Sequence, residues 1–96
     1  LTMPVSIALI QREEKSLAKE ETFTKNISAG GVSVTTSLNA TIGDKVKFAC
    51  RVLDFYSIAV VRNRKQVEGE TPTLHLEFED AQFPMEKLLL LQRRAA

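Results

Sequence analysis

The chain has 96 residues, of which 44% are hydrophobic and 26% are charged, and its net charge is +1. This length and composition predict one domain with a modest core, and the near-neutral charge excludes a general attraction to nucleic acid or anionic membrane. The single cysteine, Cys50, excludes an internal disulfide, and one cysteine with one histidine argues against a metal site. No secretory signal is visible, and the longest apolar run, Leu88 to Leu91, is far too short to span a membrane.

The N-terminal part predicts two strands around a charged turn. Residues 4–11 predict the first strand because every second side chain is apolar, and residues 12–15 form the turn. Residues 16–25 are expected to return antiparallel, and their polar middle favours an edge strand or one that protrudes. A helix over residues 12–21 is the alternative, but its apolar residues do not recur at helical spacing. The apolar contacts expected of the returning strand and its end are Leu17, Phe23 and Ile27.

Two further strands follow before the middle of the chain. Residues 31–36 predict a short strand with Val32 and Val34 on one face, and residues 37–44 form a loop that ends in an Ile-Gly-Asp turn. Residues 45–52 alternate most cleanly, and residues 53–54 are expected to turn or bulge the chain. The face of this strand that is expected to be buried consists of Val46, Phe48, Cys50 and Val52.

The second half predicts a long hairpin. Residues 55–67 are apolar on both faces at their centre and basic towards the hairpin end, which fits a strand crossing the middle of a barrel. Residues 68–72 make the turn, and residues 74–78 return with His75 on the outward face. Short strands joined by turns without intervening helices favour a small antiparallel barrel.

Phe83 and Pro84 predict the start of a C-terminal helix, with Glu86 early and two arginines late, as the helix dipole favours. The residues expected to share its barrel-facing side are Met85, Leu88, Leu89 and Gln92. Leu90 and Leu91 make the apolar surface of the helix wider than this side alone. Two interpretations follow: core packing with one leucine left exposed, or docking against another subunit or domain. In the second interpretation the interaction surface consists of Leu88, Leu90 and Leu91.

The turn between the second and third predicted strands carries two adjacent glycines, Gly30 and Gly31. Paired glycines admit positive φ, and Asn26 and Ser28 just before them can hydrogen-bond the local backbone. The segment Asn26-x-Ser28-x-x-Gly31 resembles the second signature of PilZ domains, which reads Asp or Asn, any residue, Ser, any two residues, Gly. The order of predicted elements from about residue 4 to residue 92 is also similar to a PilZ barrel.

This resemblance implies a mainly all-β fold, a six-stranded antiparallel β-barrel with a C-terminal α-helix, in a single domain over residues 1–96. It also implies a non-catalytic receptor for cyclic di-GMP, with Asn26, Ser28 and Gly31 as contacts and Gly30 supporting the turn. Asn26 offers both a donor and an acceptor to a guanine edge. Ser28 can donate to a phosphate oxygen, and Gly31 lets a ligand approach the backbone.

PilZ domains also use an Arg-x-x-x-Arg motif before the first strand, whose guanidinium groups bind phosphate and guanine. Residues 1–3 do not contain it, and losing its two charge-assisted contacts is expected to weaken binding by roughly two to four decades. Arg62 and Arg64 are auxiliary candidates. Two alternatives follow: the arginines lie upstream of Leu1 in a longer protein, or this is a degenerate PilZ domain that serves as an interaction or oligomerisation module.

An enzyme is not expected, because Ser28 and Cys50 would both need His75 as a base and nothing in the sequence brings them together. His75 is expected to be an ordinary exposed histidine. No cofactor or metal is expected, and the low charge and few aromatic residues disfavour single-stranded nucleic acid as a partner. The function predicted is that of a bacterial, cytoplasmic module that relays the level of cyclic di-GMP to an attached or partner protein.

Overall fold

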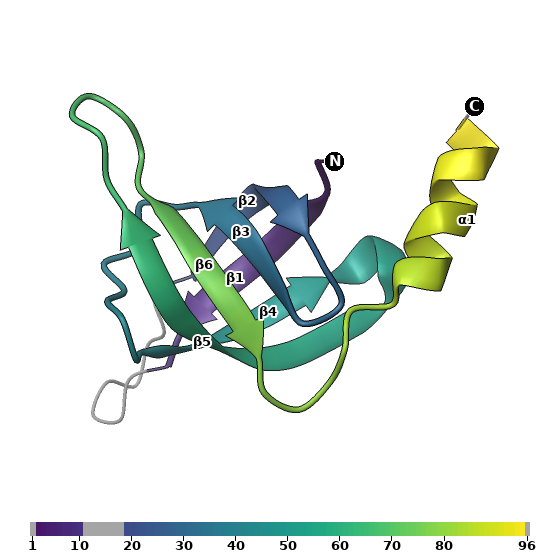
Figure 1. Cartoon of the computed structure of the whole chain (residues 1–96), viewed down its shortest axis with the longest axis horizontal. Helices are drawn as coiled ribbons and strands as arrows, with labels where there is room; N and C mark the ends of the chain where they lie inside the picture. The colour runs from purple at the N-terminus through teal and green to yellow at the C-terminus, as the bar shows by residue number, and fades with distance from the viewer. Residues whose placement is uncertain (1, 11–18, 96) are drawn as a thin grey trace.

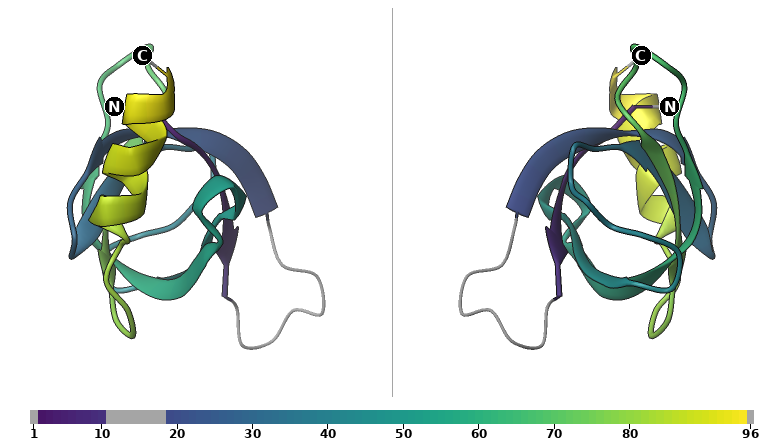
Figure 2. Two further views of the ribbon diagram at one scale, coloured as in Figure 1. Left: turned by 90° about the vertical axis from the view of Figure 1, so that its right-hand side faces the viewer. Right: turned by 90° about the vertical axis from the view of Figure 1, so that its left-hand side faces the viewer.

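The computed structural model describes residues 2–10 and 19–95. In chain order its elements are β1 (Pro4–Leu9), β2 (Lys19–Ile27), β3 (Gly31–Thr35), β4 (Lys45–Cys50), the 3-10 helix η1 (Arg51–Leu53), β5 (Phe55–Lys65), β6 (Thr73–Phe78) and α1 (Met85–Ala95) (Figure 1). The strands pair antiparallel and close in the order β1-β2-β3-β6-β5-β4. Seen along the long axis they form a ring (Figure 2). The predicted six-stranded antiparallel barrel with a C-terminal helix is confirmed.

Inward-facing side chains of all six strands fill the barrel, because alternate residues of a strand point to opposite faces. Val46, Phe48 and Cys50 of β4 are buried as predicted. The core also contains a cluster of four aromatic rings, whose centroids lie between 5.1 and 6.5 Å apart. The four rings are those of Phe48, Phe55, Phe78 and Phe83. By packing against the other three rings, Phe83 anchors the segment before α1 to the barrel.

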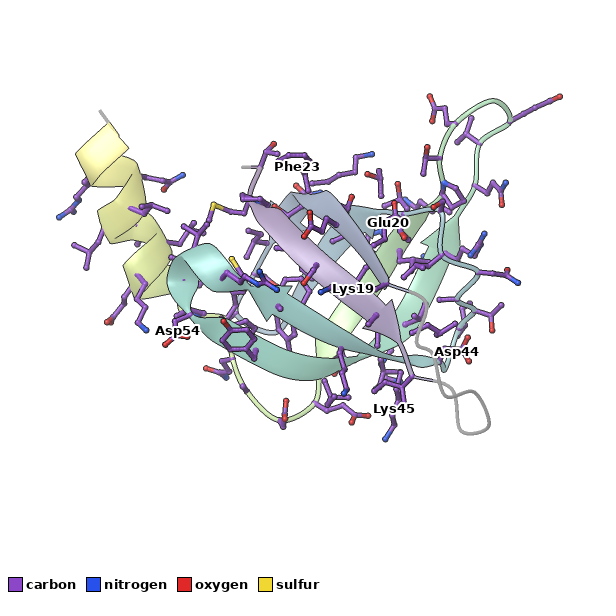
Figure 3. The ribbon with its side chains drawn as sticks, turned by 180° about the vertical axis from the view of Figure 1, so that it is seen from behind. Lys19, Glu20, Phe23, Asp44, Lys45 and Asp54 are labelled. Atoms are coloured by element: carbon purple, nitrogen blue, oxygen red, sulfur yellow. The ribbon has the colours of Figure 1, made fainter. Side chains whose placement is uncertain are left out.

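Strand β2 differs from the prediction in two ways. It pairs with β1 on one side and β3 on the other, so it is not an edge strand. Phe23 is 58% exposed, lies on the outside of the barrel (Figure 3), and leaves the inward position to Thr24. A β-bulge after Thr24 adds one residue, so that Ile27 still packs against the core. Residues 19–21 are strand rather than helix, while Leu17 and the turn at residues 12–15 lie outside the described residues.

Two tight turns set the ends of β4. Gly43 has a φ of +94°, which agrees with the predicted turn before the strand. The predicted end of β4 is wrong by two residues: Val52 lies in η1 and is 52% exposed instead of buried. Asp54 then adopts φ 52° and directs the chain into β5, so residues 53–54 do turn as expected.

Helix α1 projects beyond the strands, at the end of the molecule where η1 lies (Figure 1). Leu88 is only 3% exposed and Met85 packs half-buried against the core. Leu89 and Gln92, which were also expected on the barrel-facing side, are exposed. Because Leu88 belongs to the core, its assignment to an interaction surface is wrong, whereas Leu90 and Leu91 do lie exposed.

Candidate functional site

The hairpin turn from β2 to β3 is held by backbone contacts rather than by unusual glycine conformations. The Ser28 amide donates to the Gly31 carbonyl at 2.9 Å, and the Ser28 hydroxyl donates to the same oxygen at 3.3 Å. Neither Gly30 nor Gly31 has a positive φ, so the turn does not use the conformational freedom that paired glycines offer. A Cβ on Gly31 would instead lie 2.5 Å from the Leu76 carbonyl oxygen of β6. Gly31 is therefore required by the close approach of two strands.

The β-bulge in β2 determines how Asn26 is presented. The extra residue, Lys25, places both Lys25 and Asn26 on the exposed surface, with Asn26 opposite Ser33 of β3. Within the described residues, the Asn26 side chain forms no hydrogen bond. Its amide is therefore available to both donate to and accept from a ligand. Bulges of this kind often re-aim a side chain at a functional site.

The three predicted ligand contacts lie together in one shallow surface pocket of about 230 Å³. The pocket spans β2, β3 and β6, and is lined by Asn26, Ile27, Ser28, Gly31, Val32, Ser33, His75 and Leu76. Sequence reasoning placed Asn26, Ser28 and Gly31 on one turn. It missed Ser33 and His75, which come from neighbouring strands.

His75 is half-buried rather than fully exposed, which corrects the prediction for it. Its Nδ1 lies 3.2 Å from the Ser33 hydroxyl, at directly paired positions of β3 and β6. Nothing in the sequence indicated this contact, because it depends on which strand pairs with β6. The pairing also brings His75 into the pocket that Ser28 lines, although the hydrogen-bond partner of His75 is Ser33.

The two auxiliary arginines occupy different surroundings. Arg62 forms an ion pair with Glu77, which pairs with Gly31 across β3 and β6, but neither Arg62 nor Glu77 lines the pocket. Arg64 donates to the Ala40 carbonyl at 2.7 Å and more weakly to that of Leu38. These carbonyls belong to the loop that follows the C-terminal end of β3, whereas Gly31 lies at its N-terminal end. The Arg64 guanidinium therefore binds at the other end of β3 from Gly31.

The other chemically notable groups lie away from this pocket. Cys50 is buried inside the barrel, and this burial raises the pKa of its thiol, which disfavours the nucleophilic thiolate. Among residues 2–10 and 19–95, no group of three or more His, Cys, Asp or Glu side chains is placed to hold a metal ion. Within the same ranges, no helix has the length and apolar character needed to cross a bilayer.

Comparison with known proteins gives one match, to a family model. No match was found among the curated proteins or among the solved structures. The PilZ domain family model, in contrast, matches residues 1–92, which include every strand of the barrel and most of α1. The chain therefore belongs to the PilZ domain family.

Proposed function

We propose that this chain is a non-catalytic regulatory module that binds cyclic di-GMP in the bacterial cytoplasm. PilZ domains are generally receptors for cyclic di-GMP and generally lack catalytic activity. The observation that carries the proposal is the convergence of Asn26, Ser28 and Gly31 on one exposed pocket.

Each pocket residue has a distinct role in the proposal. Asn26 reads the edge of a guanine with its amide, which has no partner within the described residues. Ser28 turns its hydroxyl from the 3.3 Å contact with the Gly31 carbonyl towards a phosphate oxygen. Arg62 of β5, which is ion-paired with Glu77, adds a cation when it exchanges Glu77 for the ligand.

The relay to a partner runs through the backbone of the motif turn. The amide of Phe83 donates to the Ala29 carbonyl at 2.8 Å, and the amide of Phe78 donates to the Gly30 carbonyl at 3.0 Å. Phe83 stands only two residues before α1. A ligand that favours one geometry of the turn thereby also favours one position of the helix.

The test is a titration of cyclic di-GMP into the 96-residue chain, followed by calorimetry and by amide chemical shifts. We expect weak binding whose shifts centre on Ser28, Gly31 and His75, and which Asn26→Ala removes. The matched control is Asn39→Ala, because Asn39 is also exposed but lies in the loop after β3. Shifts spread over the barrel, or equal loss in both variants, would contradict the proposed site.

A second candidate function is a degenerate domain that acts through protein contacts alone. The exposure of Leu89 and Leu90 on α1 favours it. Absence of any shift at about 1 mM ligand, together with no gain from upstream arginines, would select this function over the receptor.

A further inference from the structure

The outer side of α1 carries an apolar centre between two opposite charges. Leu89 and Leu90 are 55% and 58% exposed, respectively. Glu86 precedes them by three and four residues, and Arg93 follows them by four and three. At 3.6 residues per turn these four side chains share one face of the helix. This face, which we call the outer stripe, points away from the side on which Leu88 is buried.

The two charges of the outer stripe have no ion-pair partner among residues 2–10 and 19–95. Glu86 and Arg93 are seven residues apart, about 10 Å along the helix axis, which is too far for an ion pair between them. Neither forms an ion pair with any other residue that the structure describes. The stripe therefore presents an acidic end, two leucines and a basic end to its surroundings.

This pattern is complementary to itself when it is reversed. We propose that α1 pairs with α1 of a second copy of this chain, antiparallel, about a two-fold axis between Leu89 and Leu90. Leu89 of each copy then packs on Leu90 of the other, and Glu86 of each copy faces Arg93 of the other. The two-fold axis repeats each contact, as in other isologous interfaces.

The same charges exclude the parallel arrangement. A parallel pair would place Glu86 against Glu86 and Arg93 against Arg93, and like charges at facing positions are unfavourable. Antiparallel pairing also sets opposite ends of the two helix dipoles side by side. Charge thus selects the direction and the register, while the leucines supply the buried apolar surface.

The interface expected from one short helix is small, so the dimer should be weak and should form at high protein concentration. Sedimentation equilibrium over a concentration series up to about 1 mM measures its dissociation constant. The variants are Glu86→Arg, Arg93→Glu and the double exchange. Lys87→Glu is the matched control, because it changes the net charge as Arg93→Glu does but lies off the outer stripe. Far-ultraviolet circular dichroism checks that each variant keeps its fold.

We expect each single reversal to weaken the dimer on the order of tenfold, since the axis repeats the repulsion at two pairs. The double exchange should restore wild-type association, and Lys87→Glu should leave it within about twofold. Three results would each overturn the proposal: a wild-type chain that stays monomeric throughout the series, reversals without effect, or a double exchange that fails to restore the dimer. The outcome is independent of nucleotide binding, because no step of the test involves cyclic di-GMP.

Discussion

Met3 and Thr24 hold each other by two hydrogen bonds: the Thr24 amide donates to the Met3 carbonyl at 2.9 Å, and the Met3 amide donates to the Thr24 hydroxyl at 2.9 Å. Both residues are buried, which anchors the start of β1 against β2. Thr24 is only two residues from Asn26. Met3 is therefore held against the strand that carries Asn26.

The first prediction concerns the affinity for cyclic di-GMP when an Arg-x-x-x-Arg segment is added before Leu1. Adding an upstream segment that contains two arginines four residues apart should tighten cyclic di-GMP binding by roughly two to four decades. Isothermal titration of the extended chain measures the gain. The control segment carries lysines in their place, because lysine keeps the charge but loses the forked donors. Equal affinity with and without the arginines would argue against a receptor at this pocket.

The adjacent glycines Gly30 and Gly31 should differ in how much an alanine substitution destabilises the protein. Gly31→Ala should lower the free energy of unfolding by about 1–3 kcal/mol, because the new Cβ meets the Leu76 carbonyl at 2.5 Å. Gly30→Ala should change the same quantity by less than about 1 kcal/mol, since nothing lies within 4 Å and its φ is not positive. Urea unfolding of the two variants checks this. Equal destabilisation would contradict the role given to the strand contact.

A second pair of variants tests the aromatic cluster. Phe83→Leu should lower the free energy of unfolding by about 1–2 kcal/mol, because Phe83 is buried against three other rings. Phe23→Leu makes the same chemical change at an exposed position and should stay within about 0.5 kcal/mol of wild type. Thermal and urea unfolding both report the difference. If Phe23→Leu lowered the free energy of unfolding as much as Phe83→Leu, the assignment of Phe83 to the core and Phe23 to the surface would be refuted.

Glu20 of β2, whose side chain is labelled in Figure 3, should make the stability of the protein depend on pH in the acid range. Partial burial raises the pKa of this carboxyl, but hydrogen bonds from Thr36 and Ser37 together outweigh it and hold the pKa below the ordinary value of 4.5. A carboxyl with a lowered folded-state pKa stabilises the protein above the unfolded value, and this contribution is lost as the pH falls through the folded value.

The substitution Glu20→Gln should therefore cost roughly 1 kcal/mol of unfolding free energy near neutral pH, and progressively less below about pH 4.5. Urea unfolding at a series of pH values between about 3 and 7 measures this convergence. Glu21→Gln is the control, because Glu21 is the exposed neighbour and its carboxylate accepts no hydrogen bond from the described residues. If Glu20→Gln lowered the free energy of unfolding equally at every pH, the ionised carboxylate would not be the source of the stabilisation.

Local patterns were sufficient to predict most of the barrel. The alternation of β4 placed Val46, Phe48 and Cys50 inside, because the period of a strand is set by its own backbone geometry. The turn at Gly43 was likewise readable, since its conformation is set by neighbouring residues. The signature residues Asn26, Ser28 and Gly31 lie on one turn, so their proximity also followed from the sequence.

The remaining features depend on contacts between segments that are distant in the chain. The bulge after Thr24 reversed the inside and outside of β2, which sequence alternation alone does not reveal. His75 reached the pocket only through the pairing of β6 with β3, and Gly31 is required there by the approach of Leu76. Leu88 and Leu89 are identical side chains on adjacent positions, yet one is core and the other is surface. Sequence alone determined the order of the strands, the turn at Gly43 and the family motif, whereas tertiary packing decided which side chains meet, because each such contact joins groups that no local pattern relates.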